Sequence, residues 1–305
     1  MPNVADKSSL TPTATRDFLA EPAKPFAIGL KPLSDLNFLQ VDNQFLSERQ
    51  QKAELYKSMH DEICVAEADT VAAQNEVEDL ILKCLKSYHG DLYDFSDEGA
   101  TCRQTGAFFA RNPDMPISSI GALIAEDLVL MRRDDTGWRL VGASLSFPAY
   151  WSLKDKFTKS LERVHGPVPL SDQMSQRIRR IFDNINPDIP VWRTNWSLTD
   201  DNRLRQEQRE DWRSDRRKVM STEVFVRAEL QTLHKLPDSG DILFTIWTKI
   251  SPIKSLANDD TGRRKLSVLH RQYLDMSDEE RDYKGINRNA DGLLAWLEEN
   301  GSVEI

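Results

Sequence analysis

His165 stands where a helix-like segment meets a rigid stop, in the stretch LERVHGPVPL at 161–170. Steps of four residues back from His165 reach Leu161, Phe157 and Leu153, which predicts one buried stripe on one helix. The Gly-Pro pair after the histidine predicts the end of that helix. Such a histidine can pack at the core edge, place a cation at a helix C-terminus, or bind a metal or haem iron as a neutral ligand. The residues alone leave these three roles open.

A second polar group lies on a predicted strand. The runs TEVFVRAELQTL at 222–233 and DILFTIWTKI at 241–250 flank the turn PDSG, which predicts a β-hairpin. Strand alternation puts Arg227, Glu229 and Gln231 on one face of the first run. Such a row is typical of a solvated surface, and it is also compatible with a polar ligand site.

An earlier hairpin is predicted within 128–147, around the turn residues Asp-Asp-Thr-Gly. In its second run, apolar residues alternate with Gly142, Ser144 and Ser146. Small side chains leave space beside their face of a sheet. We expect solvent or a bulky group to occupy that space.

We expect helices around these hairpins to hold the candidate site residues in place. Helical patterns cover about 43–60, 77–88, 153–165, 174–185 and the chain after 264. The order of helices, hairpin, helices, hairpin, helices lacks βαβ units and predicts an α+β fold with an antiparallel sheet. The Ser/Thr/Pro-rich start predicts a flexible tail at 1–24, followed by one domain at 25–305.

Composition excludes several classes of protein. The net charge of −9 argues against a nucleic-acid-binding protein, and no apolar run approaches the ~20 residues of a membrane span. The start has no apolar signal-peptide segment. Three cysteines without C-x-x-C spacing indicate reduced thiols in a cytoplasmic protein and no zinc or iron–sulfur site. We find no dinucleotide, Walker or hydrolase motif.

Several segments, taken in order, resemble the haem-dependent oxidative N-demethylase family, which contains bacterial dimethylamine monooxygenases. These segments are EDLVLM (126–131), GWRLVGASLSFPAYWSLKDK (137–156), VHGPVP (164–169), RTNW (193–196) and ELQTLHKLPDSGDILFTIWTK (229–249). The similarity runs from GLKPL at 29–33 to the YKG…WL region near the C-terminus. It implies a PAS-like antiparallel sheet with extensive flanking helices.

The resemblance also implies a haem b site and roles for particular residues. His165 becomes the expected axial ligand of the haem iron. Arg193 and Arg227 are expected to pair with the haem propionates, as alternatives to ordinary internal ion pairs, and Asn195 to lie beside the cofactor. Glu229 is expected to hold a protonated amine, with Gln231 orienting it. Trp192 and Trp196 are expected to pack.

The implied reaction is oxidative N-demethylation of a secondary or tertiary amine with O2, releasing formaldehyde. No flavin, NAD or iron–sulfur segment is evident, so a separate reductase is expected as the electron donor. The chain has Thr248-Lys249 where the family often has Thr-Tyr, which leaves the amine and any use of folate open. The alternative is a non-catalytic haem sensor or haem carrier. Assembly into a homo-oligomer is also left open.

Overall fold

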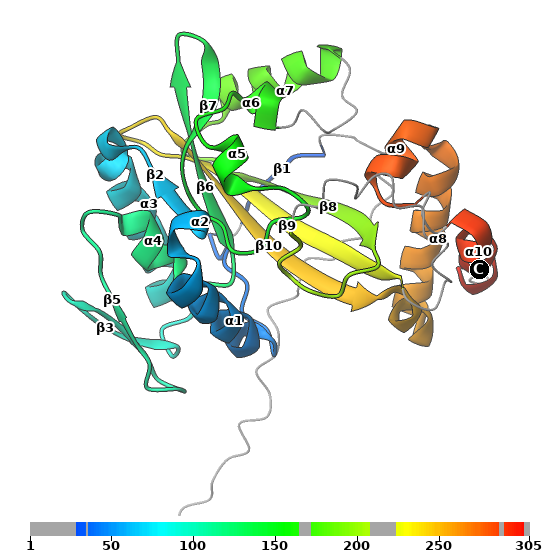
Figure 1. Cartoon of the computed structure of the whole chain (residues 1–305), viewed down its shortest axis with the longest axis horizontal. Coiled ribbons are helices and arrows are strands. Elements are labelled where there is room, and N and C mark those ends of the chain that lie inside the picture. The colour runs from blue at the N-terminus through cyan, green and yellow to red at the C-terminus, as the bar shows by residue number, and fades with distance from the viewer. Residues whose placement is uncertain (1–28, 35, 165–171, 208–223, 287–289, 302–305) are drawn as a thin grey trace, which may run out of the picture.

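A computed structural model describes residues 29–34, 36–164, 172–207, 224–286 and 290–301 (Figure 1). The predicted tail at 1–24 and His165 lie outside these described residues. The predicted mixed fold, with a large antiparallel sheet and flanking helices, is confirmed.

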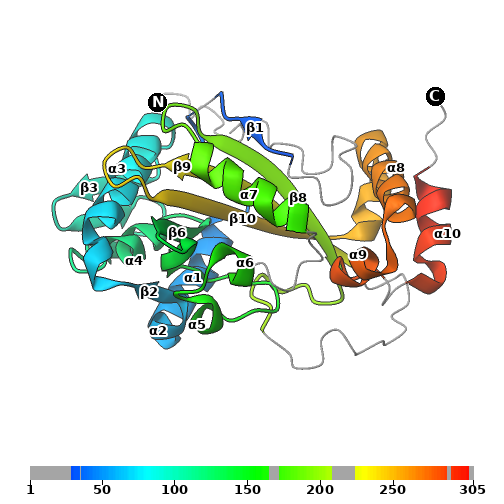
Figure 2. The ribbon, with the colours of Figure 1, turned by 90° about the horizontal axis from the view of Figure 1, so that it is seen from above.

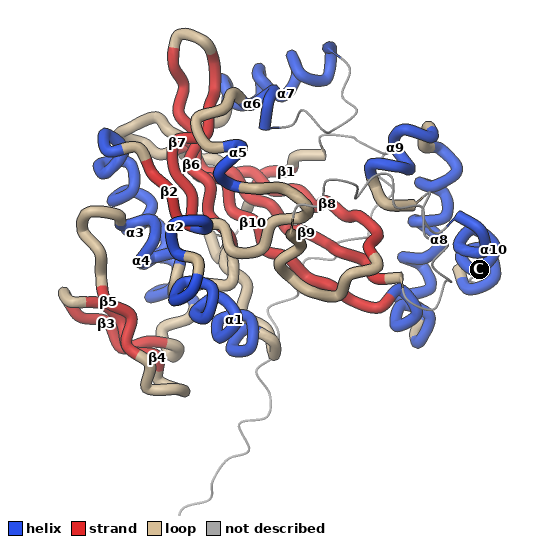
Figure 3. Tube along the Cα trace, in the orientation of Figure 1, coloured by secondary structure: helices blue, strands red, loops and turns tan. Residues whose placement is uncertain are grey.

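One seven-stranded sheet forms the centre of the molecule (Figure 3). Its strands are, in spatial order, β1 (Lys31–Pro32), β8 (Val191–Thr199), β9 (Phe225–Lys235), β10 (Ile242–Pro252), β6 (Asp127–Asp134), β7 (Gly137–Ser144) and β2 (Cys64–Ala66). All neighbouring pairs are antiparallel. Both predicted hairpins, β6–β7 and β9–β10, are confirmed, and the pairing of β10 with β6 joins them.

Helices cover both faces of this sheet. One face, here the α3 face, carries Val226, Ala228 and Leu230; the other, here the α7 face, carries Arg227, Glu229, Gln231 and Leu233. The α3 face packs against α1 (Phe45–Ser58), α3 (Val71–Tyr88) and α4 (Pro116–Gly121) at one end. At the other end it packs against η3 (Ile253–Asn258), α8 (Asp260–Asp275) and α10 (Ala290–Asn300). The short helix α9 (Asp278–Tyr283) lies between α8 and α10 in the chain. The α7 face packs against α5 (Leu153–Lys156), α6 (Leu161–Val164) and α7 (Asp172–Asn184), and Figure 2 shows α7 over the long strands.

Smaller elements complete the N-terminal half. These are α2 (His60–Ile63), η1 (Ala68–Thr70), and a separate sheet of β3 (Tyr93–Ser96), β4 (Gly99–Cys102) and β5 (Phe108–Ala110). The helix predicted at 77–88 is confirmed as part of α3. Val77, Ile81, Cys84 and Leu85 are buried in the main core, Leu80 is partly buried, and Tyr88 at the end of the helix is exposed.

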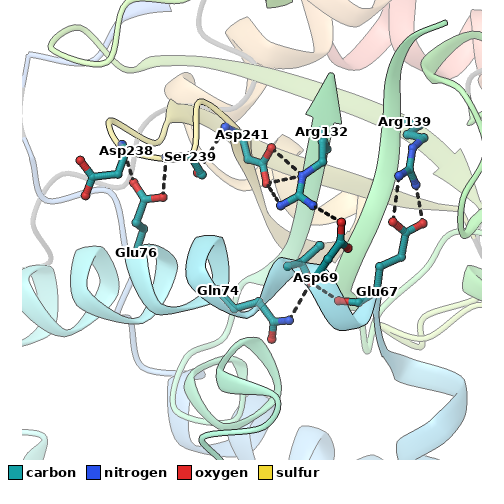
Figure 4. A network of polar contacts seen from close by, with 10 residues as sticks. Glu67, Asp69, Gln74, Glu76, Arg132, Arg139, Asp238, Ser239 and Asp241 are labelled. Carbon is teal, nitrogen blue, oxygen red and sulfur yellow. Dashed lines mark hydrogen bonds and ion pairs between the residues drawn. The ribbon is translucent and has the colours of Figure 1, made fainter. Parts of the chain in front are cut away.

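A polar network at one end of the large sheet ties the β9–β10 turn to α3 (Figure 4). Glu76 on α3 accepts the backbone N–H groups of Asp238 and Ser239, each at 2.9 Å. Arg132 on β6 forms a bidentate pair with Asp241 at N–O distances of 2.8 and 3.1 Å. The turn therefore has fixed contacts to two other elements.

The prediction of one helix over 153–165 is wrong. The chain forms two short helices, α5 and α6, and Thr158 between them has a φ of 64°. Thr158 donates its N–H to Leu140 O at 2.9 Å, and Leu140 donates to Lys159 O at 3.1 Å. Strand β2 pairs only with residues 142–144 of β7, so the earlier backbone groups on this edge of β7 would lack hydrogen-bond partners. The bonds to residues 158 and 159 supply them. Leu153 and Leu161 still reach the same buried cluster, as the stripe predicted.

The small residues of β7 do not face solvent or a large vacant space. Ser144 is fully buried, and its hydroxyl lies 2.5 Å from Tyr56 Oη. A Cβ added at Gly121 of α4 would lie 2.2 Å from Ser144 Oγ. The expectation is therefore corrected at Ser144: the small residue permits the close approach of α4 and of Tyr56.

Candidate functional site

Five of the predicted site residues lie together on two neighbouring strands of the α7 face. In the antiparallel register of β8 and β9, Arg193 is opposite Gln231 and Asn195 is opposite Glu229. Paired residues in such a register project from the same face of the sheet. Arg227 lies two residues from Glu229 on β9. The sequence placed these residues in two separate segments, and the pairing of β8 with β9 joins them.

Glu229 is the centre of this cluster. Its Oε2 accepts hydrogen bonds from Asn195 Nδ2 at 3.2 Å and from Gln231 Nε2 at 2.9 Å. Its Oε1 accepts from Arg227 Nε at 3.3 Å. Three donors therefore orient the carboxylate, and the side chain as a whole is 14% exposed. This arrangement suits the binding of a small cation.

Arg227 is almost completely buried, and its main hydrogen-bond acceptors are two backbone carbonyls and the Glu229 carboxylate. Its guanidinium donates to Leu204 O at 2.7 Å and to Phe147 O at 2.6 Å, in addition to Glu229. Asp127 accepts the backbone N–H of Phe147 at 2.8 Å. Arg227 therefore fastens two loops, one after β7 and one after β8, to the sheet. Its contacts are those of the internal ion pair that we considered as the alternative to propionate binding.

Arg193 differs from Arg227 because its Nε is buried and has no hydrogen-bond partner among the described residues. Burial lowers the pKa of this guanidinium, and the charge of Glu229 acts in the opposite direction. A buried donor without a partner costs free energy, and the cost is larger for a charged group. An anionic ligand would satisfy Arg193.

Lys284, which the sequence did not point to, joins the cluster from the segment after α9. Its buried Nζ donates to Asn195 Oδ1 at 2.8 Å and to Trp196 O at 2.6 Å. Burial lowers the pKa of Lys284 to about 7, and repulsion from Arg193 acts in the same direction. The only signal in the sequence was the YKGI segment, and nothing in it indicated contact with β8.

The tryptophans of β8 serve packing, as predicted. Trp196 is buried among the C-terminal helices and donates its Nε1–H to Gln272 at 2.9 Å. Trp192 packs against the main core and lies below the ammonium of Lys31.

The predicted iron ligand His165 lies outside the described residues, so its role stays a prediction. The described chain up to it ends in α6, where Leu161 and Val164 pack on the α7 face. The helix that leads to His165 and the Glu229 cluster therefore share one face of the sheet.

Two negative findings concern the described part of the chain only. It contains no group of three or more His, Cys, Asp and Glu residues arranged to hold a metal ion. None of its helices has the length and apolar character required for a membrane span.

A comparison with known families matches residues 29–294 of the chain to one family, described as haem-dependent oxidative N-demethylase, alpha subunit-like. The match includes every residue of the Glu229 cluster as well as His165. The resemblance inferred from the sequence is thereby confirmed.

Proposed function

The chain belongs to the haem-dependent oxidative N-demethylase, alpha subunit-like family, and we propose that it oxidises the N-methyl group of a secondary or tertiary amine. The observation that carries this proposal is the Glu229 carboxylate, which three donors hold on a partly exposed side chain. Nearby, the buried Nε of Arg193 has no partner within the part of the chain that the structure describes. One surface thus offers a negative group for an ammonium ion and a positive group for an acidic cofactor.

The described residues would suit a haem b on the α7 face, and His165 would be the residue that binds its iron. The buried Nε of Arg193 supports this fit, because a propionate would supply the missing acceptor. Asn195, which donates to Glu229 and lies two residues from Arg193 on β8, would lie beside the cofactor. Arg227 would act there by holding the two loops in place, because its donors already bond to Leu204, Phe147 and Glu229.

We also propose that the sheet is PAS-like and that residues 25–305 form one domain. Among the five long strands, the first in the chain, β6, lies beside the last, β10, and the helices α5–α7 connect the second strand to the third. This order supports the PAS-like assignment. The three cysteines are free thiols, which suits the proposed cytoplasmic location.

Glu229 would bind the substrate as an ammonium ion and take up its proton at a carboxylate oxygen before oxidation, which needs the free electron pair of the nitrogen. Gln231 would hold the carboxylate in the orientation that directs the methyl group toward the cofactor. The bound haem would supply the activation of O2. Overall, the amine, O2, two electrons and two protons would give the shortened amine, formaldehyde and water.

The two electrons require a donor, and we propose a separate reductase. The family description as alpha subunit-like is in keeping with a partner protein. The haem would supply the oxygen chemistry. The chain would contribute the iron ligand, the pocket and the Glu229 carboxylate that binds the substrate.

Spectroscopy and product analysis test this proposal. Protein from haem-sufficient cells should show a Soret band that the His165→Ala variant loses or shifts strongly. His60→Ala, on the N-terminal helix α2, is the matched control and should keep the band. With a reductant, O2 and a panel of methylated amines, wild type should release formaldehyde, and Glu229→Gln should do so at least about tenfold more slowly.

Different outcomes separate the candidate functions. A colourless protein that takes up no added haem would overturn the haem proposal. A haem protein that releases no formaldehyde with any amine or electron donor would be a sensor or carrier instead of an enzyme.

A further inference from the structure

Lys284 reaches the Glu229 cluster from an element far along the chain, and its backbone fixes it there. Its carbonyl accepts the N–H of Leu198 on β8 at 2.8 Å. The next residue, Gly285, has a φ of 74°, and a Cβ there would lie 2.2 Å from Leu198 O. Only glycine tolerates both conditions, so the sequence at this turn permits close docking of Lys284 on β8.

The side chain of Lys284 orients the amide that binds Glu229. Nζ donates to Asn195 Oδ1 at 2.8 Å, which leaves the Nδ2 of Asn195 to donate to Glu229 Oε2 at 3.2 Å. Nζ also donates to Trp196 O at 2.6 Å and lies 5.2 Å from the centroid of the Trp196 ring. The amide of Asn195 therefore connects Lys284 to the carboxylate of Glu229, which is proposed to bind the substrate.

The charges that act on Lys284 come from three elements. Arg193 of β8 lowers its pKa, whereas Glu229 of β9 and Glu280 of α9 raise it; burial is the largest influence and lowers the pKa to about 7. Lys284 thus changes its charge within the pH range in which most enzymes are assayed.

We propose that Lys284 is a positioning residue that controls the uptake of a cationic amine at Glu229, which binds the amine when Lys284 is neutral and releases it when Lys284 is charged. This inference rests on the proposed function. A neutral amine keeps two N–H groups, so the bonds to Asn195 and Trp196 persist in both states. The charge beside the carboxylate then changes while the bonds to Asn195 and Trp196 are kept.

The size of the pH effect on amine binding follows from the fraction of protein in which Lys284 is neutral. Apparent affinity is the intrinsic affinity multiplied by that fraction, so binding of the amine should weaken about tenfold from pH 8 to pH 6. Dimethylamine stays an ammonium ion over this range, as a lysine side chain in water does. Binding near pH 7 should also release a fraction of a proton from Lys284.

Calorimetric titration of dimethylamine into the full-length, haem-loaded protein between pH 6 and pH 8 tests the inference without turnover. Lys284→Met should bind the amine equally well at both ends of the range. Lys284→Arg, which stays charged over this range, should bind more than tenfold more weakly than wild type at pH 8 and show no pH dependence. Lys254→Met, an exposed position on η3, is the control and should behave as wild type does.

Lys284→Gln covers the case in which Lys284→Met does not fold, because its amide can still donate to Asn195 and Trp196. An unchanged tenfold pH dependence in Lys284→Gln, or tight binding by Lys284→Arg at pH 8, would overturn the inference and leave the proposed function intact. If wild type bound no methylated amine at any pH and released no formaldehyde, the proposed function would fall first, and this inference with it.

Discussion

Arg227 is a buried charge that connects two loops to the sheet and helps to orient Glu229. It is 1% exposed, and its guanidinium binds Phe147 O, Leu204 O and Glu229. Substitution would remove this donor from two carbonyls and one of the three donors from the Glu229 carboxylate. The position of the loops and the orientation of Glu229 therefore depend on the same residue.

We expect Arg227→Met to lower the free energy of unfolding by about 3 kcal/mol or more, because it leaves buried acceptors unsatisfied. Urea denaturation followed by circular dichroism measures the change. Arg103→Met is the control: its pair with Asp94 is half-exposed, so the loss should stay below about 1 kcal/mol. Equal effects of the two substitutions would contradict the structural role of Arg227.

At the residue scale, the sequence predicted which side chains of β9 share a face. Arg227, Glu229 and Gln231 share a face because side chains alternate along a strand, and this needed no knowledge of neighbours. Lys284 could not be predicted, because its contact with Asn195 depends on how the C-terminal helices dock on β8. Nor could local pattern show that Arg227 binds carbonyls while the buried Nε of Arg193 has no partner among the residues that the structure describes.

At the scale of elements, the close approach of α4 to β7 explains the small side chain of Ser144 on that strand. A Cβ at Gly121 would lie 2.2 Å from Ser144 Oγ and 2.7 Å from Ser144 Cβ. At Gly142, two residues earlier on β7, the nearest atom to an added Cβ would be 3.6 Å away. The helix-to-strand spacing is thus determined at Gly121.

Two alanine substitutions separate these glycines. Gly121→Ala should destabilise the protein by about 1–3 kcal/mol, because the added methyl group overpacks a closed contact. Gly142→Ala should stay within about 1 kcal/mol, since its methyl group meets ordinary van der Waals neighbours. Thermal or urea unfolding measures both, and a Gly121→Ala variant as stable as wild type would refute the tight approach.

The broken helix at 157–160 shows where periodicity is insufficient. Leu153, Phe157 and Leu161 have helical spacing and do face one core, but the open edge of β7 takes the backbone between them. Local spacing predicts which side chains are buried. It does not reveal that a strand elsewhere in the chain needs hydrogen-bond partners.

At the scale of the whole molecule, the sheet has a protected centre and weaker margins. Strand β10 pairs with β9 along its full length and with β6 on its other side. The sheet of β3, β4 and β5 is separate and short, and β5 is partly exposed. Local stability should follow this arrangement.

Hydrogen–deuterium exchange detected by mass spectrometry should therefore find the slowest amides in peptides from β9 and β10. Peptides from β3–β5 should exchange first among the strands, because this sheet has only short strands and its outer strand β5 is partly exposed. Faster exchange in β10 than in β4 would show that the large sheet is not the most stable unit.

The central place of β10 also has a consequence for synthesis on the ribosome. Strand β6 and its partner β7 are translated long before β10, which must pair with the open edge of β6 through contacts such as Leu243 with Leu130. Until β10 emerges, the nascent chain carries an apolar strand with one unpaired edge, a site for association with other chains. Pairing over such a sequence separation is slow. Chaperone supply and growth temperature should consequently govern the yield of folded protein more strongly than codon choice in the first half of the gene.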